Sequence, residues 1–294
     1  MKKVNDTIYD SAWKDVIEGI FPDFILFFFP LAYHDIDWSK GFKFHNKELG
    51  RIYKDHEVGN KRVDELVEVY LLDGCFKWLF IHIEVQGYKD NDFLERMYIY
   101  NYRLSDKYKK EIISFAVLSD NNPDYKPYKY ETGRWGFKHI TEFPIVKLTD
   151  YINKLDELEK SENPMSMVVL SSLENHRVKN TEEKFNVKLN LIRKLYKKGY
   201  DKTGILSVLR FIDWIITLPP EFEEKIKEEV DKMEGEPMAY VTSFERIAAK
   251  KAVLETEKKT ALKMLKKNYS PEEIADLTDL TLEEITALKV VDRV

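Results

Sequence analysis

The chain has 294 residues, of which 44% are hydrophobic and 34% charged, with a net charge of −5 and a single cysteine, Cys75. This length is enough for one large domain with an appendage or for two domains. One cysteine excludes an internal disulfide framework and a zinc site built from cysteines. No run of about 18 uncharged apolar residues predicts a membrane span, and residues 1–10 lack the apolar stretch of a signal peptide. We therefore expect a cytoplasmic protein that does not associate with membranes.

The first half of the chain alternates between helical and extended patterns. Apolar residues at helical spacing predict a helix over 5–18, and an aromatic, proline-bounded stretch at 21–33 is expected to be a buried connection. Two β-rich runs, at 62–72 and 77–86, flank Asp73-Gly74, which is a strong hairpin signal. The remaining pattern predicts a short helix over 47–55 and a helix over 91–107. It also predicts a buried strand over 111–118 and an extended pair within 135–148. This order predicts a mixed α/β domain over residues 1–150.

The second half of the chain has apolar residues at helical spacing throughout. We expect a helical region over 151–240, followed over 241–294 by a long helix and a small helix-turn-helix-like module. Ser270-Pro271-Glu272-Glu273 has the capping serine, first-turn proline and acidic residues typical of a helix start. A lysine cluster precedes it, formed by Lys258, Lys259, Lys263, Lys266 and Lys267. The module is interpreted as a DNA contact, a homodimer contact or a solvated face.

The hairpin gathers polar residues on one strand face. With Asp73-Gly74-Cys75 as the loop, Asp64 is expected directly opposite Glu84, and His82 and Gln86 share this face because side chains alternate along a strand. A two-residue loop would instead place Asp64 opposite Ile83, on the wrong face. Two carboxylates in this position repel each other unless a cation lies between them. Mg²⁺ binds one or two carboxylates together with waters and phosphate oxygens, so the pattern is suited to phosphodiester hydrolysis. The alternative is a solvated strand face on which acidic residues align by chance.

A family resemblance rests on the same residues. Arg62-Val63-Asp64, followed by a strand, a turn and the run from Ile81 to Gln86 (Ile-His-Ile-Glu-Val-Gln), resembles the PD-(D/E)XK nuclease superfamily. Within it, the pattern is similar to the recombination-promoting nuclease / putative transposase (Rpn-type) family. The resemblance implies a restriction-endonuclease-like mixed-sheet core followed by an all-helical C-terminal region.

The resemblance also implies an active site formed by Asp64, Glu84 and Gln86. Asp64, Glu84 and the backbone carbonyl of Val85 are expected to bind Mg²⁺, or Mn²⁺ in its place. Gln86, the single glutamine of the chain, is expected to position water or phosphate. Most superfamily members have lysine at this position. The resemblance implies that the Rpn-type group shares the glutamine, and it leaves the general base unassigned.

Further residues are candidates for supporting roles. Arg96, Tyr100 and Arg103 share one face of the predicted helix after the hairpin, where they line a phosphate track or cover apolar surface. Arg62 and His82 are candidate substrate contacts, with a purely structural role as the alternative. Glu18 is a candidate accessory carboxylate of the metal site or a solvated helix residue.

Two functions are therefore considered. The first is an Mg²⁺-dependent DNA endonuclease, which the resemblance links to recombination or mobile-DNA processing. The second is a catalytically inactive protein with a nuclease fold that binds nucleic acid or protein. The net charge of −5 does not by itself indicate a nucleic-acid partner, although a local basic track is sufficient for one.

Overall fold

The computed structural model describes residues 12–46, 63–74, 76–84 and 92–232, and short stretches between 260 and 278. The side chains at 63–64, 76, 79–84 and 231 lie outside this description, as do the whole residues Arg62, Val85 and Gln86, the predicted helix over 47–55 and the lysine cluster. Contacts within the chain divide it into two compact units, Met1–Met233 and Glu234–Val294.

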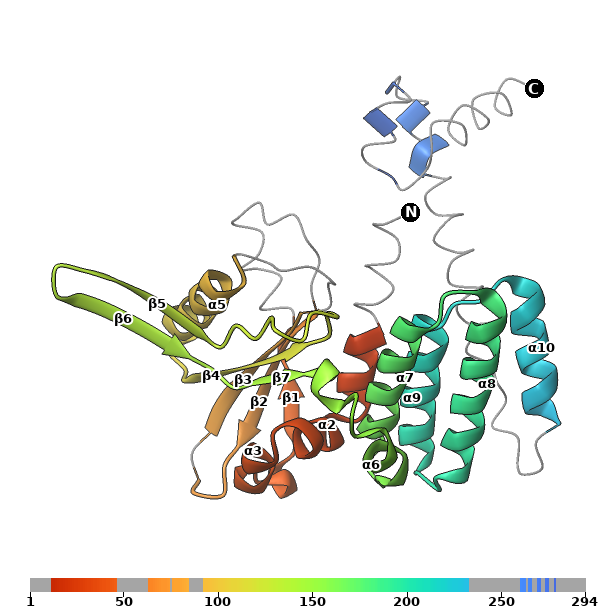
Figure 1. The fold of residues 1–294 in the computed structure, drawn as a ribbon. Helices are drawn as coiled ribbons and strands as arrows, with labels where there is room; N and C mark the ends of the chain where they lie inside the picture. The colour runs from red at the N-terminus through yellow and green to blue at the C-terminus, as the bar shows by residue number, and fades with distance from the viewer. Residues whose placement is uncertain are drawn as a thin grey trace. The chain divides into compact units, whose positions relative to one another are not determined.

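A five-stranded mixed sheet lies in one half of the first unit, beside the helices of the other half, and the predicted mixed α/β class is confirmed (Figure 1). Its strands lie in the order β1-β2-β3-β4-β7. β1 pairs antiparallel with β2, and β2 with β3, whereas β3, β4 and β7 run parallel. The parallel step from β3 to β4 needs a crossover, which α5 (Phe93–Tyr108) provides. The strand bounds are β1 Phe42–Phe44, β2 Val63–Tyr70, β3 Phe76–Glu84, β4 Ile112–Leu118 and β7 Ile145–Lys147.

Helix α5 covers one face of this sheet. Apolar residues at helical spacing, Phe93, Met97 and Leu104, are buried in one cluster with the even-numbered strand residues Leu66 and Trp78. Alternation along the strands means that every even-numbered position of β2 and β3 belongs to this face. We call it the α5 face.

The opposite face of the sheet packs on N-terminal helices. Phe29, between α2 (Phe21–Phe28) and α3 (Pro30–Asp35), stacks on Phe115 of β4 at a centroid distance of 4.1 Å. The helix over 12–19 connects this layer to the helical region, since Trp13 contacts Phe211 edge-on at 5.1 Å. It also passes so close to α9 (Lys202–Ile215) that a Cβ at Gly19 would collide with the side chain of Ser207.

The helices predicted after residue 150 are confirmed up to residue 231. In chain order they are α6 Leu155–Lys160, α7 Met165–Arg177, α8 Thr181–Lys197, α9 Lys202–Ile215 and α10 Pro220–Asp231. Side-chain oxygens cap two of them, because Asn180 accepts from Glu183 N and Asp201 accepts from Gly204 N.

A buried charge network joins α8, α9 and α10. The ammonium of Lys188, which is fully buried, donates to Asp213 Oδ1 at 2.7 Å and to both carboxylate oxygens of Glu223 at 2.8 and 2.9 Å. Glu223 also accepts from the backbone N–H of Leu218 at 3.2 Å. Charged groups removed from water need such partners, so this network fixes how the three helices pack.

Two predictions about which secondary structure the first 150 residues form are wrong. The stretch expected to be a connection at 21–33 contains α2 and most of α3, because Pro22 and Pro30 occupy first-turn positions where proline starts a helix. The extended segments within 135–148 do not pair with each other. β6 (Phe137–Glu142) instead pairs with β5 (Lys129–Arg134), and β7 joins the main sheet beside β4.

The second unit is described over a few residues. The predicted helix start at Ser270 is confirmed by a capping box, in which Glu273 N donates to Ser270 Oγ at 3.2 Å and Ser270 N donates to Glu273 Oε2 at 2.8 Å. Ala261 and Ile274 are buried against each other, with Met264 and Leu265 packed beside them.

Candidate active site on the central hairpin

The β2–β3 hairpin has a different register from the predicted one. Asp64 pairs with His82, and the prediction that Asp64 lies directly opposite Glu84 is wrong. The cause lies at the turn, where the last pair is Tyr70 with Phe76. Leu71 bridges to Ile36 instead of continuing the hairpin, so the two strands separate earlier than a three-residue loop requires.

The shift of two residues keeps the candidate site on one face. Because side chains alternate along a strand, positions 64, 82 and 84 all belong to the α5 face of the sheet. Glu84 is the diagonal neighbour of Asp64, and diagonal positions in an antiparallel pair are roughly 7–8 Å apart. A cation with its water shell fits between two carboxylates at such a spacing more easily than between directly opposed ones.

The helix that follows β3 provides buried residues next to this face. Tyr100 is 6% exposed and belongs to the core cluster, so its ring packs on the sheet. Arg96 is 8% exposed, and Arg103 is half-buried. Of the three residues considered for a phosphate track, Arg103 is thus the one with an accessible side chain.

Glu18 lies beside Glu65 on the other face of β2. Its carboxylate accepts from Asn46 Nδ2 at 2.9 Å, and Asn46 in turn accepts from the backbone N–H of Leu66 at 3.2 Å. Lys14 contacts both acids, with its ammonium 3.9 Å from Glu18 and 4.0 Å from Glu65. Sequence reasoning missed Glu65, a fully buried acid whose only signal is its place among the apolar residues of β2.

Sequence reasoning also missed a buried ion pair at the end of the sheet where Glu84 lies. The strand pairing aligns Glu84 with Leu118 and Leu118 with Lys147, so Lys147 lies two strands away at the same end of the sheet. Its ammonium pairs with Asp120, which follows β4 and also accepts from Asn122 N at 2.9 Å. Burial lowers the pKa of Lys147 below its ordinary value, and the charge of Asp120 opposes this shift. A lysine inside the apolar run after Phe143 was the signal available in the sequence.

The residues predicted to bind a metal ion fall mostly outside the description. Asp64, His82 and Glu84 are placed by their backbone, whereas Arg62, Val85 and Gln86 are not described. Among the side chains that are described, no group of three or more His, Cys, Asp or Glu could hold a metal ion. The metal site therefore stays a prediction supported by backbone positions.

Comparisons with known proteins give no assignment. No family model matches the chain, and neither a curated protein nor a solved structure is significantly similar to it. Within the described residues, no helix combines the length and the apolar character needed to cross a membrane.

Proposed function

We propose that this protein is a Mg²⁺-dependent endonuclease of the PD-(D/E)XK type, with Asp64, Glu84 and Gln86 in its active site. The observation that carries the proposal is the register of the hairpin, which brings the positions of Asp64 and Glu84 to one end and one face of the sheet. The sequence resemblance to the Rpn-type family supports the same residues and suggests a role in recombination or mobile-DNA processing.

The arrangement of elements is compatible with this proposal. N-terminal helices precede three antiparallel strands, and α5 crosses over to a parallel fourth strand. Asp64 lies at the start of β2 and Glu84 at the end of β3, so both are at the same end of the hairpin.

The donor set suits a hard divalent cation. Two carboxylates and a backbone carbonyl, from Asp64, Glu84 and Val85, are oxygen ligands of the kind that Mg²⁺ and Mn²⁺ prefer. When bound, such a cation acts as a Lewis acid on the phosphodiester and lowers the pKa of a coordinated water. Gln86 would hold the attacking water or a phosphate oxygen by hydrogen bonds, since an amide both donates and accepts but cannot act as a base.

Plasmid cleavage tests the proposal. Supercoiled plasmid is incubated with the full chain in Mg²⁺ or in EDTA, and the wild type is compared with Asp64→Asn and Glu84→Gln. We expect nicking with Mg²⁺ that is lost in EDTA and in both variants. The matched control is Asp106→Asn, an exposed acid on α5 whose partner is Lys109. Equal cutting by the wild type and both active-site variants would overturn the assignment.

The second candidate is a nuclease fold without cleavage activity that binds nucleic acid. The observation that favours it is Gln86, which stands where most superfamily members have lysine. Thermal stability separates the two, because a cation at 100 times its Kd stabilises the folded state by about 2.7 kcal/mol. A melting temperature unchanged by Mg²⁺ and Mn²⁺, with nucleic-acid binding retained in Asp64→Asn, would favour the second candidate.

A further inference from the structure

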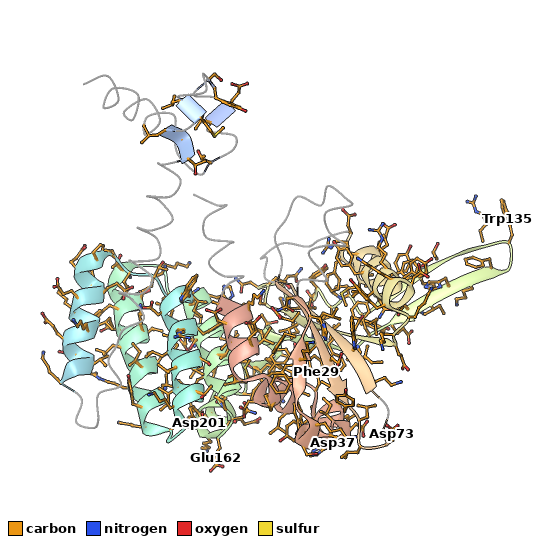
Figure 2. All side chains as sticks on the ribbon, turned by 180° about the vertical axis from the view of Figure 1, so that it is seen from behind. Phe29, Asp37, Asp73, Trp135, Glu162 and Asp201 are labelled. Carbon is orange, nitrogen blue, oxygen red and sulfur yellow. The ribbon has the colours of Figure 1, made fainter. Side chains whose placement is uncertain are left out.

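The β5–β6 hairpin is a two-stranded ribbon outside the main sheet. It extends away from the sheet and α5, with Trp135 at its far end (Figures 1 and 2). The turn consists of Trp135 and Gly136, both with positive φ, at 52° and 88°. Isolated hairpins are marginally stable in water, so a ribbon that projects in this way is expected to have a use.

The two faces of the ribbon have different chemistry. One face has the charged residues Lys129, Glu131, Lys138 and Glu142, which pair with one another. Lys129 contacts Glu131 at 2.7 Å and Glu142 at 3.7 Å, and Lys138 contacts Glu131 at 2.9 Å. Two cations and two anions cancel, as on an ordinary solvated surface.

The other face of the ribbon is aromatic. By the strand register it has Tyr130 and His139 near the base and Arg134 opposite Phe137 near the tip. Tyr98 of α5 stacks on Tyr130 at 5.1 Å with nearly parallel planes and lies 4.5 Å from the ring of His139.

The aromatic rings continue in both directions from this contact. On α5, Tyr102 stacks beside Tyr98 at 6.3 Å and is 57% exposed. Toward the tip, Phe137 is 69% exposed, and Trp135 follows at 95%. We call this line of rings, formed by Tyr102, Tyr98, Tyr130, His139, Phe137 and Trp135, the aromatic track.

Trp135 is unfavourable in its position unless it has a partner. A bulky side chain in the left-handed region costs about 1–2 kcal/mol, and asparagine or glycine is favoured at this turn position. Its exposed ring gains almost no packing within the chain; the described contact is the guanidinium of Arg134 at 5.5 Å. Neither local conformation nor packing therefore explains the tryptophan.

We propose that the aromatic track binds single-stranded nucleic acid, with bases stacking on the exposed rings of Trp135, Phe137 and Tyr102 and Arg134 pairing with a phosphate. This inference rests on the proposed function, in which nucleic acid is the substrate, and it specifies the form of that substrate. Flat rings in series are the recognition surface that unpaired bases use, because every base has a face that can stack.

The charge of the track favours a single strand over a duplex. Duplex binding without base reading depends on many cations that neutralise phosphates. The track has one arginine, Arg134, which forms no ion pair with any described residue. Stacking must then provide most of the affinity, and stacking requires bases that are not already stacked and paired in a duplex.

Fluorescence anisotropy tests this inference in EDTA, where cleavage cannot occur. The probes are a labelled 20-nucleotide oligothymidylate and a duplex of the same length, with the full chain as the binding protein. Trp135→Asn is expected to weaken single-strand binding roughly 5- to 150-fold. The same variant should leave the melting temperature unchanged or raised, because asparagine suits the turn better than tryptophan. A structural role for Trp135 would have the opposite effect on melting.

Two further variants sharpen the result. Arg134→Gln should reduce the slope of log affinity against log salt by about 0.7. Ile140→Ala on the ion-paired face, where the side chain is 43% exposed, is the control and should bind like the wild type. Wild-type affinity in Trp135→Asn, or equal weakening by Ile140→Ala, would overturn the inference. So would a dimer that Trp135→Asn converts to a monomer without loss of oligonucleotide binding.

Cleavage in Mg²⁺, measured on the plasmid and on the labelled oligothymidylate, separates this inference from the proposed function. Cleavage by the wild type together with unchanged oligonucleotide binding in Trp135→Asn would refute the aromatic track alone. Track-dependent binding without any cleavage would refute the endonuclease alone. A wild type that neither binds nor cuts nucleic acid would refute both.

Discussion

Replacing Lys188 by methionine is the sharpest test of how the helical region is held together. The substitution keeps the length of the side chain and removes the ammonium that contacts Asp213 and Glu223 at 2.7–2.9 Å. Both carboxylates then remain buried without the cation between them, since Asp213 is 0% and Glu223 4% exposed.

Removing one partner of a buried ion pair typically costs about 3–5 kcal/mol. For a unit of this size, each kilocalorie corresponds to a shift of about 2–4 °C in melting temperature. We therefore expect Lys188→Met to melt roughly 6–20 °C below the wild type. The control is Lys194→Met on the same helix, whose partially exposed ammonium pairs with Glu159 and contributes at most about 1 kcal/mol.

Urea and thermal unfolding of the full chain, followed by circular dichroism, measure the difference. The triple variant Lys188→Met, Asp213→Leu and Glu223→Met should recover most of the lost stability, because apolar groups can replace a buried charge network at little cost. A single variant as stable as the Lys194→Met control would refute the reasoning. A triple variant as unstable as the single one would show that shape, and not charge, is decisive.

Three further outcomes are expected. Burial, followed by repulsion from Asp201, raises the pKa of Asp23 above 3.8, so its contribution to stability is complete below pH 3.8 and is lost as pH rises through the folded-state pKa. Asp23→Asn should therefore melt higher than the wild type at pH 7 but not at pH 3, and equal melting temperatures at pH 7 would contradict this. Ser270→Ala removes the acceptor of Glu273 N and should destabilise that helix by about 1 kcal/mol, read as faster amide exchange at 273–274. Gln86→Ala should slow plasmid cleavage but keep the thermal shift with Mg²⁺, and Gln86→Lys should keep or raise activity. A folded Gln86→Ala protein without that thermal shift would make the amide a metal ligand.

Local patterns were sufficient to locate the elements near the candidate site. The turn at Asp73-Gly74 and the β-rich runs around it predicted β2 and β3, and apolar spacing predicted α5 and the strand after it. The capping box at Ser270 was equally visible, because both of its hydrogen bonds join residues three apart. These signals depend only on residues that are close together in the sequence, so they can be recognised without the structure.

The register of the hairpin could not be predicted in this way. It depends on Leu71, which pairs with Ile36 from a distant segment, and on the backbone bond from Leu72 N to Asp35 O at 2.9 Å. Because these residues pair outside the hairpin, its turn is longer than predicted, and Asp64 pairs with His82 instead of Glu84. The prediction that Asp64 and Glu84 share one face of the sheet still held, because a shift of two residues leaves each side chain on the same face.

The sequence by itself determined on which kind of element the candidate residues stand: the acids Asp64 and Glu84 on paired strands, followed by helices. Tertiary structure decided which of them meet. It aligned Lys147 with Glu84 across the sheet, buried Lys188 between two acids, and left Phe137 and Trp135 exposed on the projecting ribbon. The physical reason is that periodicity and capping are short-range, whereas burial and charge pairing depend on segments brought together from distant parts of the chain.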